Sequence, residues 1–422
     1  MSMLRVLCCA AALLAIPSIG IEAQSFPLAS HFVQPVMSFS ADGRYLALGG
    51  SVGPALDNCP LPTCSGRVHL WDLRAGTRVF ASDASTARVM SLAMTRDGRQ
   101  VVSGHVDGTV RVWSADGGVV HQLLCCNGSW IRSLAVSPDD RVLAAGAQNG
   151  EIVLWSLDAD LSRPGSARVL RTLTGHYFGV SSVVFEASGK YLLSSADDQH
   201  VRRWDITTGH NYEFSRTPQL RKAHRGMVKS VVPLADGRRA VSGSYWEGGT
   251  YKAYDSVAPP DHILRLWDID SGRPIRSYPL KFGVRCCIQV VPGTSSVAFL
   301  KAMAWDELPR LHVVDLDTGA VVNDVGPTMG ESFHALAMHP NGSTFLIAIG
   351  DGDFLIWSRT MGRMTGRLIS ADEGWAVIAA DGRMDFSEGF RRWPCAHGIM
   401  TGCAGGSPAT ASGRLLPSLI GQ

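Results

Sequence analysis

The stretch TGHYFGVSSVVFEASGKYLLSSADDQHVRRWDI, residues Thr174–Ile206, contains three short apolar runs separated by turn-forming residues. Val180–Phe185 and Tyr191–Ser194 flank a turn at Gly189, and Val201–Ile206 follows after two aspartates. Alternating runs of this length, bounded by Gly and Asp, are typical of antiparallel strands. We therefore predict three strands in this stretch.

The stretch opens with Gly175-His176 and closes with Trp204-Asp205. This pairing resembles the WD40 repeat, whose copies of about 40 to 45 residues form four-stranded propeller blades. The resemblance implies a polar tetrad, which maps onto His176, Ser194, Asp198 and Trp204. Because an indole N–H buried between blades needs a hydrogen-bond partner, we interpret the tetrad as structural. A catalytic Ser-His-Asp group is the rival interpretation.

Equivalent units recur along the chain. They end at Trp71-Asp72, Trp113-Ser114, Trp155-Ser156, Trp204-Asp205, Trp267-Asp268, Val314-Asp315 and Trp357-Ser358. Turn signals repeat with them, at Ala41-Asp42-Gly43, Arg96-Asp97-Gly98, Pro138-Asp139-Asp140, Ala187-Ser188-Gly189, Ala235-Asp236-Gly237 and Pro340-Asn341-Gly342. Such tripeptides favour tight hairpins because they tolerate a positive φ. The units predict an all-β fold over residues 24–370, a single seven-bladed β-propeller of four-stranded antiparallel blades.

The position six residues before the tryptophan carries a turn acid in several units, namely Asp107, Asp198, Asp261 and Asp351. The third unit has Asn149 there, the first has Ser65, and the sixth has Leu308. The sixth unit also lacks its tryptophan. We expect the first and sixth blades to be the least well held.

Composition restricts the class of partner. The chain has 422 residues, a net charge of +2 and 18% charged residues. No run of like charge suggests a nucleic-acid-binding tail, so we expect a protein or peptide partner and no nucleic acid.

Residues 1–23 are typical of a secretory signal peptide. Arg5 precedes an apolar core at Val6–Ile16, and Pro17 follows. This core is too short to span a bilayer. We expect an exported protein, periplasmic or secreted, without a membrane span. A retained amphipathic start is the alternative.

An oxidising compartment would allow the cysteines to pair. Cys59 and Cys64 lie in one insertion and favour a local disulfide. Cys125 and Cys126 lie in a connection between strands, where a strained disulfide between these neighbouring residues is the alternative to free thiols. Cys286-Cys287 lies in a predicted strand, where neighbouring side chains point to opposite faces. We expect free buried thiols there, because a bond would break the strand. Neither pair has the CxxC spacing of a zinc site.

Extra residues occur between the second and third strands of three units, at Val52–Cys64, Tyr245–Pro260 and Trp305–Pro309. In a propeller these connections emerge on one face, and loops on a rigid scaffold often carry recognition. Tyr245 and Trp246 would suit an aromatic binding anchor. A loop packed on its own blade is the alternative.

Four basic residues occupy one register near the start of the innermost strands: Arg132, Lys229, Arg285 and His334, here called the basic collar. Trp130 and Met227 precede two of them. At the channel mouth the collar would attract an acidic segment of a partner. A solvated rim is the alternative. A propeller hydrolase or lyase would need convergent carboxylates or histidines, so we predict no catalytic residue, metal or cofactor.

Residues 371–393, including Trp375-Ala376-Val377, resemble a hairpin that in bacterial WD-repeat proteins leads into a caspase-like peptidase domain. The Gly-, Ala- and Ser-rich segment 394–422 predicts a disordered tail. The chain could thus be the remnant regulatory half of such a peptidase. Ring closure has two candidates, Phe26–Ser38 as a strand of the last blade or the hairpin after Ile369. We predict an exported, non-catalytic scaffold, a monomer or part of a complex.

Overall fold

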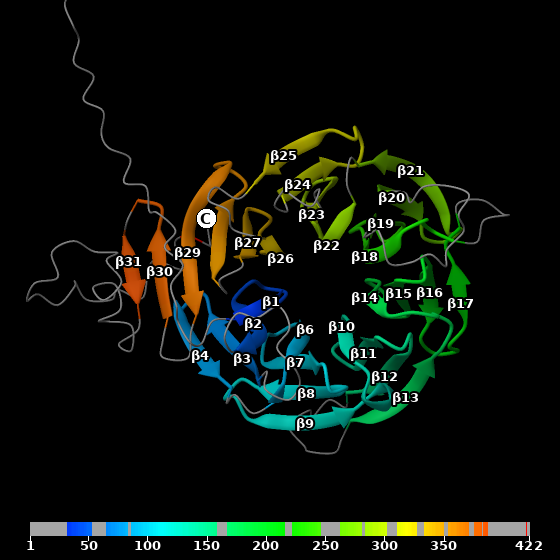
Figure 1. The fold of residues 1–422 in the computed structure, drawn as a ribbon, viewed down its shortest axis with the longest axis horizontal. Helices are drawn as coiled ribbons and strands as arrows, with labels where there is room; N and C mark the ends of the chain where they lie inside the picture. Colours follow the sequence, from blue (N-terminus) through cyan, green and yellow to red (C-terminus); the bar gives the residue numbers. More distant parts are fainter. Residues whose placement is uncertain are drawn as a thin grey trace, which may run out of the picture.

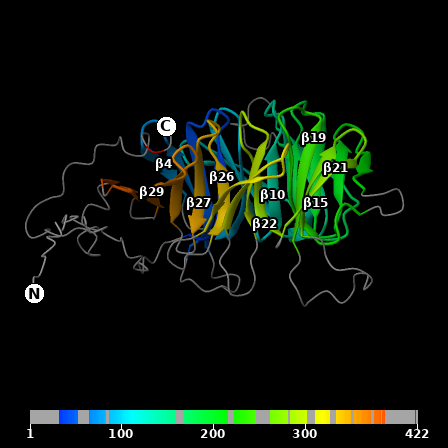
Figure 2. The same cartoon turned by 90° about the horizontal axis from the view of Figure 1, so that it is seen from above.

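The computed structural model describes residues 32–52, 65–82, 86–157, 167–215, 222–245, 262–280, 283–301, 310–326, 333–349, 353–370, 375–381, 383–386 and 419. Strands dominate these residues and form seven antiparallel sheets arranged radially around a central axis (Figure 1). Seen from the side, the sheets form a disc (Figure 2). The prediction of an all-β, seven-bladed propeller is confirmed.

Each blade is one continuous segment of the chain, and its first strand lies innermost (Figure 1). Blade 1 contains β1 (Phe32–Phe39), β2 (Tyr45–Val52), β3 (Ser65–Asp72) and β4 (Thr77–Ala81), and the short β5 (Thr86–Ala87) also pairs with β3. Blade 2 contains β6 (Val89–Met94), β7 (Gln100–His105), β8 (Thr109–Ser114) and β9 (Val119–Leu124). A 3-10 turn, η1 (Cys126–Gly128), leads to blade 3, with β10 (Ile131–Val136), β11 (Val142–Ala147), β12 (Ile152–Ser156) and β13 (Arg168–Leu173).

The remaining blades repeat this plan. Blade 4 contains β14 (Val180–Phe185), β15 (Tyr191–Ala196), β16 (Val201–Asp205) and β17 (Asn211–Glu213). Blade 5 contains β18 (Met227–Pro233), β19 (Arg239–Tyr245), β20 (Ile263–Asp268) and β21 (Arg273–Pro279). Blade 6 contains β22 (Val284–Val290), β23 (Ser296–Lys301), β24 (Arg310–Asp315) and β25 (Val321–Val325). Blade 7 contains β26 (Phe333–Met338), β27 (Thr344–Ile349), β28 (Phe354–Ser358), β29 (Arg363–Ser370), β30 (Trp375–Ala379) and β31 (Met384–Phe386).

The hairpin turns between first and second strands have the backbone that their sequences favour. The third residue of each predicted tripeptide has a positive φ: Gly43, Gly98, Asp140, Gly189, Gly237 and Gly342. Asp140 reaches φ 58° without being glycine, which Asp tolerates better than most residues. These turns fix the register of each hairpin, because loop geometry decides which residues pair.

The ring closes through side chains rather than through an exchanged strand. Strand β1 pairs with β2 in its own blade and contacts the innermost strands β26 and β6 on either side. The hairpin β30–β31 extends blade 7 to six strands, beyond the four predicted. It reaches outward beside blade 1 (Figure 1), where the Trp375 and Trp71 rings meet edge to face with centroids 5.3 Å apart. Of the two candidates for closure, the structure therefore uses the hairpin.

The vicinal cysteines differ from the prediction. The structure joins Cys286 to Cys287 in a disulfide, and likewise Cys125 to Cys126. The prediction of free thiols at Cys286 and Cys287 is therefore wrong. The strand is interrupted there, since its register shifts between Cys286 and Gln289 and Cys287 adopts φ 64°. This bulge removes the alternation that separates neighbouring side chains in a regular strand.

Several predictions concern residues outside the described ranges. These are the signal peptide 1–23, the Cys59–Cys64 disulfide, Trp246, Asp261 and Asp351. The insertions occur between the second and third strands of blades 1, 5 and 6, as predicted. In the segment 394–422 only Leu419 is described, and it packs against the apolar cluster between blades 7 and 1.

Candidate functional site

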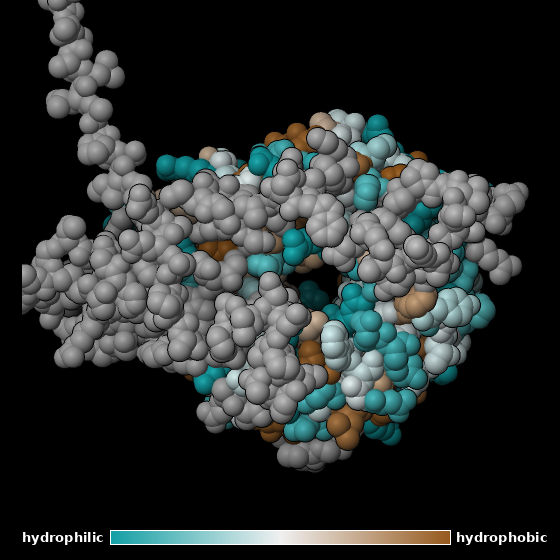
Figure 3. All heavy atoms as spheres, in the orientation of Figure 1, coloured by the Kyte–Doolittle hydropathy of each residue, from teal (hydrophilic) through white to brown (hydrophobic). Residues whose placement is uncertain are grey.

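A cavity of about 650 Å³ lies on the central axis, lined by the innermost strands of all seven blades. The space-filling view shows this hollow at the centre of the disc, with hydrophilic residues inside it (Figure 3). The basic collar lines the cavity: Arg132, Lys229, Arg285 and His334. Arg88 is a further cation in the lining, and no carboxylate side chain is among the lining residues that the structure describes.

Two members of the basic collar are bound to an aspartate that the sequence did not single out. Asp197, in the turn after β15, lies with Oδ2 2.6 Å from Arg132 Nη1 and Oδ1 2.9 Å from Lys229 Nζ. The Ser181 hydroxyl also donates to Asp197 Oδ1 at 3.1 Å. Burial works to raise the pKa of Asp197, but Lys229 and Arg132 lower it more, so the carboxylate is ionised. We call Arg132, Asp197 and Lys229 the Asp197 clamp, because they join blades 3, 4 and 5.

Two other cations lie in the cavity without an ion pair to any residue that the structure describes, Arg285 and Arg88. Arg285 is exposed on β22. Arg88, which immediately precedes β6, is half-buried and its Nε is buried without a hydrogen-bond acceptor among the described residues. Burial lowers the pKa of Arg88. Sequence reasoning missed Arg88 because it lies two residues before the collar register, which in blade 2 holds Met90.

In each of blades 2–5 a serine follows the collar register by one residue and joins neighbouring innermost strands. The Ser91 hydroxyl donates to Ile131 O at 3.0 Å, and Ser133 Oγ accepts from Val183 N at 2.9 Å. Further round, Ser182 donates to Val231 O at 3.5 Å, and Ser230 accepts from Ile288 N at 3.2 Å. The seam blades carry apolar residues at this register, Val36 and Ala335. The sequence signal was the serine that follows the collar register by one residue in blades 2–5.

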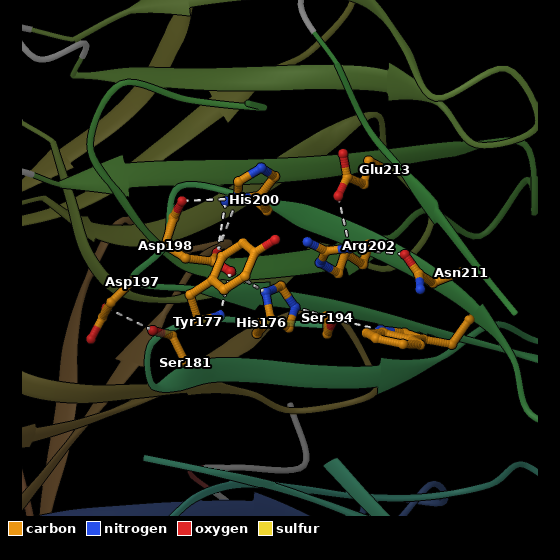
Figure 4. Close-up of polar contacts among 11 residues, drawn as sticks. His176, Tyr177, Ser181, Ser194, Asp197, Asp198, His200, Arg202, Asn211 and Glu213 are labelled. Carbon is orange, nitrogen blue, oxygen red and sulfur yellow. Dashed lines mark hydrogen bonds and ion pairs between the residues drawn. The ribbon is translucent and has the colours of Figure 1, made fainter. Parts of the chain in front are cut away.

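The predicted tetrad is assembled inside blade 4 (Figure 4). His176 Nδ1 lies 2.8 Å from Asp198 Oδ2, and His176 Nε2 lies 2.7 Å from Ser194 Oγ. Trp204 Nε1 donates to the same Ser194 oxygen at 2.7 Å. The four residues therefore form one continuous chain of hydrogen bonds.

The order Asp, His, Ser in this chain matches the connectivity of a catalytic triad, so its surroundings decide its role. Ser194 is 0% exposed, and its oxygen accepts the indole proton. Burial lowers the pKa of His176 and favours the neutral imidazole. Burial works to raise the pKa of Asp198, but hydrogen bonds from His176 and His200 bring it below its usual range. A substrate cannot reach this serine, and the arrangement supports a structural role.

Blades 2 and 5 contain variants of the same network. In blade 5, Ser242 Oγ lies 2.7 Å from His224 Nε2 and accepts from Trp267 Nε1 at 2.8 Å.

In blade 2, Ser103 Oγ lies 2.8 Å from His105 Nε2 and accepts from Trp113 Nε1 at 2.8 Å. Here the histidine comes from β7 instead of a loop, and its Nδ1 donates to Ala87 O at 2.7 Å. Asp107 pairs with Thr109 rather than with a histidine.

The predicted tryptophans of the repeats differ from blade to blade in their burial and hydrogen bonding. Trp71, Trp155 and Trp267 are buried, and Trp357 is half-buried. The indole nitrogens of Trp71 and Trp357 are buried and have no acceptor among the described residues. Blades 1 and 7 therefore lack the network.

The apolar and aromatic residues that we predicted to contact a partner differ in their exposure to solvent. Trp130 is 46% exposed, whereas Met227 is only 8% exposed and offers little surface to a partner. Tyr245 is half-buried at the end of β19.

No group of three or more His, Cys, Asp or Glu side chains in the described ranges is placed to hold a metal ion. None of the helices described is long and apolar enough to cross a membrane.

Comparison with known proteins agrees with this architecture. The family model "WD domain, G-beta repeat" matches residues 76–114, 118–156 and 167–205. Each matched repeat contains the outer strand of one blade and the three inner strands of the next. The matched residues therefore contain WD40 repeats, set within a seven-bladed β-propeller.

Curated relatives match parts of the chain. Nuclear distribution protein PAC1-2 of Uncinocarpus reesii is 29% identical over 165 residues, 34% of this chain and 34% of the relative. The small ribosomal subunit protein RACK1 of Candida albicans is 30% identical over 112 residues, 26% of this chain and 31% of the relative. A guanine nucleotide-binding protein subunit beta of Zea mays is 28% identical over 196 residues, 46% of this chain and 47% of the relative. The chain thus spans less than half the length of each of these relatives.

Proposed function

We propose that this propeller is a non-catalytic scaffold that binds a protein or peptide partner through an acidic segment inserted at the central channel. WD40-repeat proteins generally act as protein-interaction scaffolds, which supports the class of function. The observation that carries the proposal is the charge of the cavity. Among the described residues, its lining holds the cations Arg88, Arg132, Lys229 and Arg285 and no carboxylate side chain, and one adjacent carboxylate compensates two of the four.

A surplus of positive charge in a concave, partly desolvated site favours acidic ligands in two ways. It accelerates their diffusional encounter, and it makes the cost of desolvating a bound carboxylate smaller than at a neutral site. The same surplus disfavours metal ions and basic segments. Ser194 and His176, the residues that resemble catalytic groups, are buried inside a blade and do not line the cavity.

The experiment is a binding titration of the full chain with a fluorescein-labelled peptide of alternating acidic and small residues. The control peptide carries Asn and Gln at the acidic positions. Fluorescence anisotropy should show saturable binding of the acidic peptide, weakened by added salt, and little binding of the amide peptide. Equal binding of both peptides, or binding of neither, would overturn the proposal.

We further propose that the protein is exported and works in an oxidising compartment. The signal-like residues 1–23 support this proposal, and the two vicinal disulfides are consistent with it. Cell fractionation with N-terminal sequencing of the mature protein tests it. Recovery from the cytoplasm with residues 1–23 attached would contradict export.

A further inference from the structure

We infer that the acidic segment binds on one side of the channel only, between Arg285 and Arg88, while the Asp197 clamp on the other side is a structural joint. This inference rests on the proposed function and specifies its site and ligand. It assigns the binding role to Arg88, which the repeat pattern did not reveal, and removes it from Arg132 and Lys229.

The Asp197 clamp is already saturated. Both Asp197 oxygens are engaged, Oδ2 by Arg132 Nη1 at 2.6 Å and Oδ1 by Lys229 Nζ at 2.9 Å. The side chains of Arg132, Lys229 and Asp197 are 20%, 17% and 17% exposed. An incoming carboxylate would have to displace Asp197 and leave that buried charge without a partner, which is costly.

The opposite side is open. Arg285 is exposed and Arg88 is half-buried with its Nε unsatisfied, and neither contacts a carboxylate that the structure describes. A half-buried guanidinium without an anion pays a desolvation cost that a ligand carboxylate would offset. These two arginines are therefore the cations that gain most from binding an acidic group.

The wall between the two arginines defines the rest of the ligand. Going round the ring from β22 to β6, the lining passes through blades 7 and 1, where His334, Val36 and Met37 are half-buried and Ala335 and Leu336 are buried. Two arginines separated by one imidazole and two partly exposed apolar side chains fit an extended segment with two acidic side chains flanking a small apolar residue. The ligand is therefore a peptide of the pattern acid, apolar, acid, rather than a uniformly acidic tract.

The test measures affinity for a fluorescein-labelled peptide of that pattern with variants of the full chain. Arg88→Gln and Arg285→Gln should each weaken binding by about tenfold or more, the usual effect of losing a charge-assisted hydrogen bond. The variant Arg132→Gln/Asp197→Asn/Lys229→Gln removes the whole clamp and should change affinity by less than about threefold. Arg273→Gln and Arg363→Gln, on the outer strands β21 and β29, are matched controls expected to have no effect.

Melting curves and circular dichroism establish that each variant is folded. Arg88→Lys keeps the charge and should restore part of the affinity, which separates charge from packing. Inorganic phosphate should compete with the peptide no better than chloride does at equal ionic strength. If phosphate displaces the peptide and chloride does not, the natural ligand is a phosphate group and the inference of an acidic peptide is wrong. Loss of binding in the clamp variant with no effect of Arg88→Gln and Arg285→Gln would overturn the inference. Failure of the wild type to bind would instead overturn the proposed function.

Discussion

The two sides of the ring are built from the same wedge of sheet and are held together differently. Buried apolar clusters pack between neighbouring blades all round the ring. The side of blades 2–5 adds buried polar contacts: the Ser-His-Trp groups of blades 2, 4 and 5, the serines between innermost strands and the Asp197 clamp. The seam between blades 7 and 1 depends mainly on its apolar cluster, which includes Trp71, Phe354 and Trp375. It adds a polar contact, His69 Nδ1 to Ser370 Oγ at 2.8 Å, and two extra strands.

The difference shows what each solution provides. A buried hydrogen-bond network tolerates few arrangements of its side chains, because every unpaired polar group is costly. It therefore fixes the strands and loops of a blade relative to one another. Apolar burial accepts many shapes and can close whatever gap remains after the other blades are in place. The family match covers residues 76–114, 118–156 and 167–205, from the outer strand of blade 1 to the third strand of blade 4.

The largest effect should come from the seam. Trp71→Ala should cost about 3–5 kcal/mol of the free energy of unfolding, because Trp71 is 0% exposed and packs on Trp375. Chemical denaturation measures it. Trp130→Ala, at a residue 46% exposed, is the control and should change stability by less than about 1 kcal/mol. Equal losses at the two positions would contradict the role of the seam cluster.

Acid should destabilise the protein through His105, in the network of blade 2. Burial lowers the pKa of His105 from 6.5 to about 4. The unfolded state therefore binds a proton on His105 more readily than the folded state does. The contribution of His105 to the free energy of unfolding is fully present above pH 6.5 and decreases by on the order of 3 kcal/mol as the pH falls to about 4.

Unfolding curves between these pH values measure the fall, and His105→Gln should reduce it. Part of the fall should remain, because burial also lowers the pKa of His312 to about 4. An unchanged pH profile in His105→Gln would show that His105 is not one of the responsible groups.

A matched pair of Trp→Phe substitutions compares the hydrogen-bonded tryptophan of blade 4 with the apolar-packed tryptophan of the seam. Trp204→Phe removes the donor to Ser194 and should cost about 1–3 kcal/mol beyond the change in packing. Trp71→Phe removes an N–H that has no acceptor among the described residues, so it should cost less. Thermal or chemical unfolding of both variants gives the comparison. A larger loss for Trp71→Phe would reverse it.

The smallest effect should come from the serines between blades. Ser133→Ala removes the acceptor of Val183 N–H and should cost about 0.5–1.5 kcal/mol. Hydrogen exchange should show faster exchange of the Val183 amide. No change in that amide would show that the bond does not contribute to holding blades 3 and 4 together.

The sequence predicted what local patterns determine. Strands β14–β16, the positive-φ turns and the insertion points follow from alternation and from Gly and Asp. It could not show Asp197, adjacent to the predicted turn acid Asp198, reaching residues 65 positions before and 32 after it. Such contacts depend on which blades become neighbours in space.

Three other features also depended on three-dimensional context. His105 replaces the loop histidine from within a strand, which no spacing rule anticipates. The bulge at Cys287 requires a backbone that alternation argues against. Arg88 lies outside the repeated register and is recognised only because it lines the cavity.

The most direct test is a structure of the full chain bound to the acid-apolar-acid peptide. We expect the peptide in the central channel, with its carboxylates on Arg88 and Arg285 and with Asp197 still bound to Arg132 and Lys229. A peptide bound on the outer strands, or one that displaces Asp197 from the clamp, would contradict the assignment of binding to Arg88 and Arg285 and of a structural role to the Asp197 clamp.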